Sequence, residues 1–548
     1  MDKEQTTKLY INAYRSFLKA QGRMGVDQIE GLYKQMTPSI HKKAHLDDID
    51  VEGFMYAYLR LPPQIHKIKE VILSQIGDIF LRAGYKIDYW EAVSAPARRR
   101  KMYFDGDKSL AVFINSVTDL DDMVGLLTAF SIEWNKINQK LSNFKGDIEP
   151  KNKEAIKKTL GIDDDNWDRL SRILTDNLFQ RLSEIKDSKV NFSIRLLKGS
   201  FVDYKKATQR WFENILQNTE YKDLRSRPLY FVSSNTHSLV NNITGWVNEL
   251  EDELVQFLKD KNMTQFLKYW DGINKGELPG SKENFLWYIL KKYEAENPDS
   301  KTKREAYERN LGIETISAEH YLDINAQLLS LDKIKNAPGI KKMIGLSGDK
   351  FNSDGLILNI DYPLGSGAYM VLSTLLQNVN QLKGVYILGK ASFLHANIGD
   401  IGIPSKVFDT YTNNTYIFKN SFTESDFDEF KAGSVLTGQG VVSTKGTFLH
   451  PENVIQQYFI DGYTIVEMED GPYLSAIYEA SHFSRYPEKE TIELLNNPID
   501  LGIIHYASDT PFTKAITLGT RNLGYEGVEA TYISSLVILK RIVSNELS

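Results

Sequence analysis

The sequence predicts an α/β protein in which a mainly α-helical N-terminal domain precedes a parallel sheet covered by helices on both faces. Three observations predict this fold class. Residues 1–225 carry apolar positions at helical spacing and few strand-like runs. From about residue 346 the glycines become frequent. In the same part of the chain, short apolar runs alternate with helices, which is typical of a sheet covered on both faces.

Composition excludes several classes of protein. Lys and Arg number 66 and Asp and Glu 72, so the net charge of −6 argues against a nucleic-acid partner. The chain has no cysteine, which excludes disulfides, thiolate metal sites and cysteine nucleophiles. Its charged N-terminus does not resemble a signal peptide, and no run approaches the roughly 20 apolar residues that span a bilayer. We therefore expect a cytoplasmic protein with no membrane partner.

The first 225 residues are predicted to form one helical domain. Amphipathic helices are expected over His66–Ala83, Leu120–Leu141 and Trp167–Ile185. The basic run Arg98–Lys101 is interpreted as a solvated surface patch. No chemical motif is found here, so the role of this domain stays open.

The second domain is predicted over residues 226–548. It begins with the strand Leu229–Val232, a polar turn and a helix from Leu239. A strand, a polar turn and a helix N-terminus make an anion site, with Ser233 and His237 among the donors; the alternative is a cluster that merely caps the helix. Residues 255–345 are predicted to be a helical insertion.

The rest of the second domain alternates strands with helices. The predicted strands are Leu356–Ile360, Gly384–Leu388, Tyr463–Met468 and Gly502–Ala507, and the predicted helices are Ala368–Leu382, Pro472–Phe483 and Tyr525–Val543. In open α/β sheets, ligands bind beyond the carboxyl ends of the strands. Small, glycine-containing turns are expected after the first two strands, and acids follow the last two. The pattern predicts a polar pocket with paired carboxylates above the sheet.

Four segments in this region resemble one known family. The segments are DYPLGSGAYMVLSTLL, LGKASFLHANIGDIGIP (388–404), IVEMED (465–470) and HYASDTP (505–511). Together and in this order they resemble the nucleoside phosphorylase and nucleosidase superfamily over about residues 350–545. The resemblance implies a nucleoside-phosphorylase-like mixed sheet, and with the helical N-terminal region the arrangement is similar to that of an AMP nucleosidase.

The resemblance implies a role for each motif residue in cleaving a purine–ribose bond. Asp509 is the expected acid for the departing base, and Glu469 accepts hydrogen bonds from the ribose hydroxyls; these two are the expected catalytic residues. Met468 and Glu467 are expected at the ribose. Phe448, or alternatively a core phenylalanine at that position, and Ser508 are expected at the base. The expected phosphate-side residues are Gly389, Lys390 and Ser392, together with Ser233 and His237.

The nucleophile is where the chain departs from the family. The arginine expected near the glycine turn is missing, and Lys390 or Arg521 would have to replace it. A lysine offers a point charge and not a fork, which favours water over phosphate as the nucleophile. The prediction is therefore a hydrolytic purine nucleosidase that acts on a nucleoside or nucleotide. The alternatives are a phosphate-dependent phosphorylase and a catalytically silent nucleotide-binding regulatory module.

Other ligands are not indicated. The nine histidines include no HExxH motif, and no acidic run has EF-hand spacing, so we expect no metal and no cofactor. The resemblance implies a homo-oligomer in which a neighbouring subunit closes the pocket.

Overall fold

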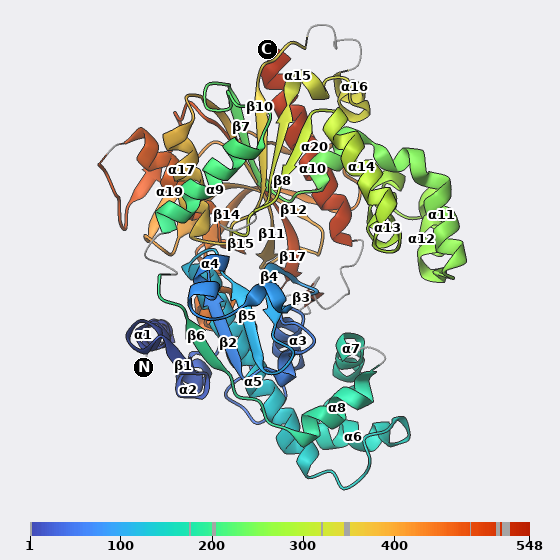
Figure 1. The fold of residues 1–548 in the computed structure, drawn as a ribbon, viewed down its shortest axis with the longest axis vertical. Coiled ribbons are helices and arrows are strands. Elements are labelled where there is room, and N and C mark those ends of the chain that lie inside the picture. The colour runs from blue at the N-terminus through green and yellow to red at the C-terminus, as the bar shows by residue number, and fades with distance from the viewer. Residues whose placement is uncertain are drawn as a thin grey trace.

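Two β-sheets organise the chain (Figure 1). The computed structural model describes residues 3–174, 177–199, 204–318, 322–344, 351–482, 484–510, 516–517 and 526–547. Within these residues, a six-stranded sheet lies in the first 200 positions and a twelve-stranded sheet in the remainder. The expected α/β class is confirmed, with helices against both sheets.

The six-stranded sheet corrects the prediction of an almost purely helical first domain. Its strands are β1 (Arg23–Gly25), β2 (Glu70–Ser74), β3 (Glu91–Ala95), β4 (Arg98–Phe104), β5 (Ser109–Phe113) and β6 (Ser193–Leu196), in the order β1-β6-β2-β5-β4-β3. The expected helix His66–Ala83 is instead a short 3₁₀ turn, β2 and the six-residue α4 (Gly77–Arg82). Val71, Ile72 and Leu73 are all buried because β2 lies inside the sheet, so the segment lacks the alternation typical of a half-exposed strand.

Helices still account for more of the first half than strands do. They are α1 (Lys3–Gln21), α2 (Asp27–Met36), α3 (Val51–Tyr58), α5 (Val117–Ser142), α6 (Lys153–Leu160), α7 (Asp164–Leu174), α8 (Leu178–Asp187) and α9 (Tyr204–Asn218). The expected helix Leu120–Leu141 lies within α5. The expected helix Trp167–Ile185 falls on parts of α7 and α8.

The twelve-stranded sheet contains every strand that the sequence predicted. Its strands are β7 (Leu229–Ser234), β8 (Ile313–Ile316), β9 (Ala326–Ser330), β10 (Leu356–Asp361), β11 (Leu382–Phe393), β12 (Ile401–Asp409), β13 (Asn414–Ile417), β14 (Val435–Ser443), β15 (Ile465–Glu467), β16 (Thr491–Glu493), β17 (Asp500–Thr510) and β18 (Ile516–Thr517). Five of them close a ring, because β11 pairs with β17, β17 with β12, β12 with β14, β14 with β15, and β15 again with β11.

Helices cover this sheet on two sides. On one side lie α9, α17 (Gly367–Asn378) and α19 (Asp470–Ser481), and on the other α10 (Ser238–Thr244) and α20 (Glu526–Leu547) (Figure 1). The short α15 (Leu331–Ile334) and α16 (Pro338–Ile344) follow β9, and α18 (Glu452–Ile460) precedes β15. These helices bury the sheet and leave its strand ends to form a site.

The predicted helical insertion ends earlier than expected. Its helices, α11 (Glu251–Asp260), α12 (Thr264–Asn274), α13 (Lys282–Glu296) and α14 (Pro298–Asn310), form a lobe with a core of its own (Figure 1). The following strands β8 and β9 belong to the main sheet, where β9 pairs with β10. Residues 313–330 are therefore part of the second unit and not of the insertion.

Residues 445–451 join the two halves. Phe448 and Leu449 belong to the core of the first half, where the Phe448 ring lies edge-on to Tyr56. A Cβ on Gly125 of α5 would lie 3.0 Å from Phe448, which is closer than an ordinary van der Waals contact. The absence of a side chain at Gly125 therefore lets α5 pack against the ring. The amide of Ser39 donates to the His450 carbonyl over 2.7 Å. The second half thus completes the core of the first.

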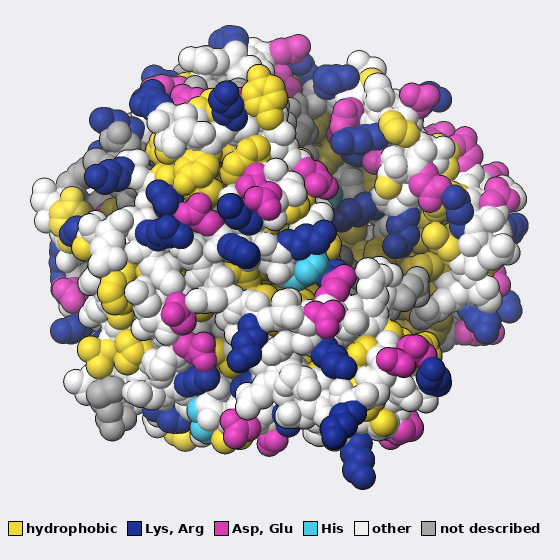
Figure 2. Space-filling model, turned by 60° about the horizontal axis from the view of Figure 1, so that its bottom comes forward, with side chains coloured by type: hydrophobic (Ala, Val, Ile, Leu, Met, Phe, Trp, Pro, Cys, Tyr) yellow, Lys and Arg dark blue, Asp and Glu magenta, His cyan; other side chains and the backbone are white. Residues whose placement is uncertain are grey.

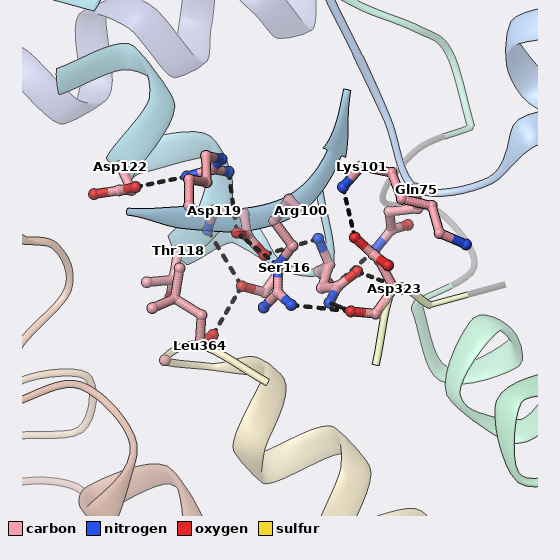
Figure 3. A network of polar contacts seen from close by, with 12 residues as sticks. Gln75, Arg100, Lys101, Ser116, Thr118, Asp119, Asp122, Asp323 and Leu364 are labelled. Carbon is pink, nitrogen blue, oxygen red and sulfur yellow. Dashed lines mark hydrogen bonds and ion pairs between the residues drawn. The ribbon is translucent and has the colours of Figure 1, made fainter. Parts of the chain in front are cut away.

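A buried charge network also joins the halves (Figure 3). Arg98 donates to Asp122 over 2.9 Å and to Asp119 over 3.3 Å. Arg100 donates to Asp119 and to the Asp323 carbonyl, which lies between β8 and β9. Within the basic run Arg98–Lys101, Arg98 and Arg100 are therefore not solvated, since their side chains pair with Asp119 of α5 and are 5% and 10% exposed.

One face of the molecule shows no single dominant charge. Figure 2 shows basic and acidic side chains intermixed over the face that it presents, with a hollow to the right of its centre. None of the helices in the described ranges is long and apolar enough to cross a bilayer.

Replacing Phe448 with alanine should lower the free energy of unfolding by about 3–5 kcal/mol, because it leaves a cavity in the first core. The matched control is Phe459→Ala, whose ring is 44% exposed and whose loss should cost about 0.5 kcal/mol. Urea denaturation measures both. Equal losses in the two variants would contradict the buried junction.

The stability of the junction should depend on His450. Burial lowers the pKa of this imidazole to about 4, whereas in the unfolded chain it titrates near about 6.5. The unfolded state therefore binds the proton first, and stability is lost as the pH falls from the unfolded pKa toward the folded one. We expect about 2 kcal/mol less stability at pH of about 5 than at about 7.5 from this group. His450→Gln should flatten this part of the profile; an unchanged profile would contradict the assignment.

Candidate active site

Three strands of the closed ring bring the motif residues together. Gly389 of β11 pairs with His505 of β17, and further along β11, Ser392 lies between Val466 of β15 and Asp509 of β17. The two acidic segments that the sequence singled out therefore flank the same stretch of β11. That their carboxylates converge stays a prediction, because the Asp509 side chain lies outside the described part of the structure.

Glu467 is held entirely by its own chain. Ser443 of β14 donates its hydroxyl to one carboxylate oxygen, and the amides of Glu469 and Asp470 donate to the other, the latter over 2.9 Å. Burial raises the pKa of Glu467 well above its ordinary value, and the charges of Asp470 and Glu469 raise it further. Both carboxylate oxygens of Glu467 therefore accept hydrogen bonds from the protein, two of them from the first amide of α19 and the amide of the residue before it. Glu467 holds the start of this helix and does not lie at a ribose as expected.

Asp470 and His505 form a buried pair. Asp470 Oδ2 lies 2.7 Å from His505 Nε2, and both side chains are at most 2% exposed. Burial by itself lowers an imidazole pKa, but Asp470 outweighs it and raises the pKa of His505, with a further contribution from Glu469. Among the described residues, Asp470 Oδ1 and His505 Nδ1 have no hydrogen-bond partner.

The same cluster has the donor types of a metal site. Ligand atoms of Glu467, Asp470 and His505 lie within 4.8 Å of one another. However, the direct bond between Asp470 and His505 leaves no room for an ion between them, and Glu467 is occupied by hydrogen bonds. The geometry therefore favours a hydrogen-bonded charge cluster.

Glu469 is the carboxylate of this group that is partly exposed. Its Oε1 accepts the amide of Gly365 over 3.0 Å. Burial raises the pKa of Glu469, while the Gly365 amide and the charge of His505 oppose the rise. A backbone hydrogen bond from Met468 opposes the rise as well.

The loop that carries Gly365 is clamped by the first half of the chain (Figure 3). Leu364 and Gly365 both have φ of 58°, and the Ser116 hydroxyl donates to the Leu364 carbonyl over 3.1 Å. A Cβ on Gly365 would lie 2.3 Å from the Thr118 hydroxyl, so only glycine fits. Thr118 also accepts the Ser366 amide over 3.1 Å. The N-terminus of α5 thus fixes the partner of Glu469.

Asp509 lies at an irregularity of β17. Ala507 pairs with Ala391, but the next residue of β11, Ser392, pairs with Asp509, so Ser508 is bulged. Bulges re-aim side chains and are frequent beside active sites. The Asp509 side chain lies outside the described part of the structure, as does all of Arg521. Ser508, expected at the base, is buried and donates its hydroxyl to the Ala391 carbonyl over 3.1 Å.

The expected phosphate-side residues do not form an anion site. β11 continues through Gly389 and Lys390 to Phe393, so no glycine turn follows Leu388. Lys390 is exposed, and Ser392 is partly buried in the strand.

The backbone amides of the Ser233–Ser238 turn already donate to side chains of the protein. The Asn235 side chain accepts the amides of His237 and Ser238, and Asp361 accepts the amide of Thr236. The Ser233 hydroxyl accepts from Tyr473 over 2.8 Å and is buried. A carboxylate already occupies the position that an anion would take, so the alternative of a helix cap is the one the structure supports.

Phe448 and Met468 lie in different environments. Phe448 is 1% exposed within the first core, which places it as the core phenylalanine that the sequence left as an alternative. Met468 is half-buried beside Glu469.

Several residues at the site were not predicted. Thr118 and Tyr411, whose hydroxyls lie 2.6 Å apart, come from α5 and from the turn after β12. Ser116 and Asp119 carry the Ser-x-x-acid signature of a helix start, which predicts the cap but not its contact with a loop more than 240 positions away.

Comparisons with known proteins give one family and several partial structural likenesses. A family model described as "Family of unknown function (DUF6909)" matches residues 26–544. A comparison with proteins of curated function gave no match. Among solved structures, the AMP nucleosidase of Bacteroides thetaiotaomicron shares 12% identity at a TM-score of 0.30, over 63% of this chain and 99% of its own.

Two further solved structures cover less of the chain. The 5′-methylthioadenosine/S-adenosylhomocysteine nucleosidase of Neisseria meningitidis shares 13% identity at a TM-score of 0.29, over 42% of this chain and 90% of its own. The uridine phosphorylase of Vibrio fischeri shares 9% at a TM-score of 0.30, over 42% and 83%. At TM-scores this low, a likeness is not evidence of a shared activity.

Replacing Asp470 alone should destabilise the fold more than replacing Asp470 and His505 together. Asp470→Ala leaves a buried imidazole without its counter-charge and should cost about 3–5 kcal/mol. In a double-mutant cycle with His505→Leu, measured by urea denaturation, we expect a coupling energy of about 1–3 kcal/mol. Additive losses would show that the two side chains do not depend on each other.

Proposed function

The chain belongs to the family described as "Family of unknown function (DUF6909)", and we propose that this member hydrolyses the N-glycosidic bond of a purine nucleoside or nucleotide. The observation that carries the proposal is the position of Glu469. It is a half-buried carboxylate whose Oε1 accepts the Gly365 amide, and it follows β15, which pairs with β11 next to the strand that leads into Ser508-Asp509.

Glu469 suits recognition of a sugar diol. Its Oε2 would accept one ribose hydroxyl, and the bond from Gly365 keeps the carboxylate in place while it does so. Hydrogen bonds to the ionised form favour that form and oppose the rise in pKa that burial causes. The charge of the neighbouring His505 also opposes this rise, whereas the charge of Asp470 adds to it.

Cleavage needs charge control at both ends of the bond. The sugar develops oxocarbenium-like positive charge, which a neighbouring carboxylate stabilises. The departing base develops negative charge, and Asp509 would neutralise it by donating a proton, an effect worth about 10²–10⁴-fold. The bulge at Ser508, immediately before Asp509, supports a specialised position for this side chain.

Water is the proposed nucleophile. No arginine lies in Gly389–Ser392, Lys390 is exposed, and the Ser233–Ser238 turn is closed by Asn235 and Asp361. The predicted phosphate-side residues therefore do not favour phosphorolysis. If phosphate is required for base release, the phosphorylase alternative replaces hydrolysis.

The test is base release by the full chain. Purine nucleosides and their 5′-monophosphates are incubated with and without phosphate, and free base is measured by chromatography. We expect release without phosphate. Glu469→Gln should lower kcat/KM by about 10²-fold through the weakened hydrogen bonds to ribose. Asp509→Asn should lower kcat by about 10²–10⁴-fold.

The matched control is Asp461→Asn, an exposed carboxylate shortly before β15, which should leave the rate unchanged. Circular dichroism confirms that each variant is folded. No release from any substrate, or full activity in Glu469→Gln, would contradict the proposal and leave the silent nucleotide-binding module.

A further inference from the structure

Lys445 is a half-buried cation without an ionic partner. It lies between β14 and the 3₁₀ turn Thr447–Leu449, with its ammonium 5.7 Å from the centre of the Tyr411 ring. Among the described residues it forms no ion pair and no hydrogen bond. Burial lowers the pKa of Lys445, and the charges of Arg15 and Lys8 lower it further, against the opposing effect of Asp409 and Asp121. A lysine in this setting lacks the anion that would offset its burial.

The neighbouring acids are already engaged. Asp121 accepts hydrogen bonds from Nε and Nη2 of Arg15. It also accepts one from the Tyr14 hydroxyl, over 2.6 Å. Asp409 accepts the Tyr411 amide over 2.9 Å and the Thr412 hydroxyl over 2.7 Å. Neither carboxylate therefore serves as the direct partner of Lys445.

Arg15 adds a second cationic group from the other half of the chain. Two of its nitrogens, Nε and Nη2, donate to Asp121, and its side chain is 39% exposed. A Cβ on Gly446, the residue after Lys445, would lie 4.0 Å from Asp121, so the segment that follows β14 meets the acid that binds Arg15 of α1. A flexible ammonium beside a planar guanidinium is a combination that suits a phosphate group.

The pair lies near the proposed sugar site. Tyr411 is the link, since its ring faces Lys445 while its hydroxyl contacts Thr118, the residue that clamps the loop of Gly365. The Tyr411 hydroxyl lies 2.6 Å from that of Thr118, Thr118 accepts the Ser366 amide, and the amide of the preceding residue, Gly365, donates to Glu469 over 3.0 Å.

We propose that Lys445 and Arg15 bind a phosphate group beside Glu469. The phosphate is either the 5′-phosphate of a nucleotide substrate or free inorganic phosphate. The first source rests on the proposed function and makes the substrate a nucleoside 5′-monophosphate. The second source does not rest on it, because the anion site exists whether or not the protein cleaves a glycosidic bond.

Calorimetry on the full chain tests the site without relying on turnover. The probes are inorganic phosphate, adenosine and adenosine 5′-monophosphate. We expect Lys445→Met to weaken binding of the phosphate-bearing probes by about ten-fold or more and to leave adenosine binding unchanged. Lys445→Arg should retain most of the affinity. The matched control Lys390→Met removes an exposed lysine of β11 and should change nothing.

Amine labelling of the wild-type protein gives a second readout that needs no variant to fold. Phosphate or the monophosphate should protect Lys445, but not Lys390, from acetylation detected by mass spectrometry. Equal affinity in wild type and Lys445→Met, or no protection of Lys445, overturns the proposal.

The outcomes separate this proposal from the proposed function. Binding of inorganic phosphate with no base release would keep the anion site and refute the nucleosidase. Base release that Lys445→Met leaves unchanged for monophosphate and nucleoside alike would refute the 5′-phosphate of the substrate as the ligand of this site and keep the nucleosidase.

Discussion

The buried carboxylate of Glu467 is the contact on which the site depends. It accepts the Ser443 hydroxyl from β14 and the amides of Glu469 and Asp470 from the start of α19. One side chain therefore joins two strands of the closed ring to the helix that follows. Because the helix begins there, Glu469 faces the loop of Gly365, and Asp470 reaches His505 on β17.

The two halves of the chain form the site together. The N-terminus of α5 is held by Arg98 and Arg100 through Asp119, and from there Ser116 and Thr118 reach the loop of residues 364–366 (Figure 3). In return, the second half inserts Phe448 into the first core.

The sequence predicted what depends on local pattern. The strands within β10, β11, β15 and β17 were found because each is a short apolar run between turn residues or acids. The sheet of the first half was missed since its inner strand β2 is buried on both faces and does not alternate. The three apolar residues of β2 are followed by apolar residues at helical spacing in α4, so the whole segment has the pattern of an amphipathic helix.

The site was only partly predictable for a different reason. Glu469 and Asp509 were proposed from their motifs, and the strand register sets Asp509 opposite Ser392 of β11. By contrast, the closure of the Ser233 turn needs Asp361, and the burial of Phe448 needs Gly125, both far away in the sequence. Lys445 and Arg15 are likewise brought together only by the packing of the halves.

The most direct test is a crystal structure of the protein with a bound ribonucleoside analogue that it cannot cleave. The account predicts ribose hydroxyls within hydrogen-bond distance of Glu469 and the Asp509 carboxyl facing the base. An analogue bound elsewhere, or a space between Glu469 and Asp509 filled by packed side chains, would contradict it.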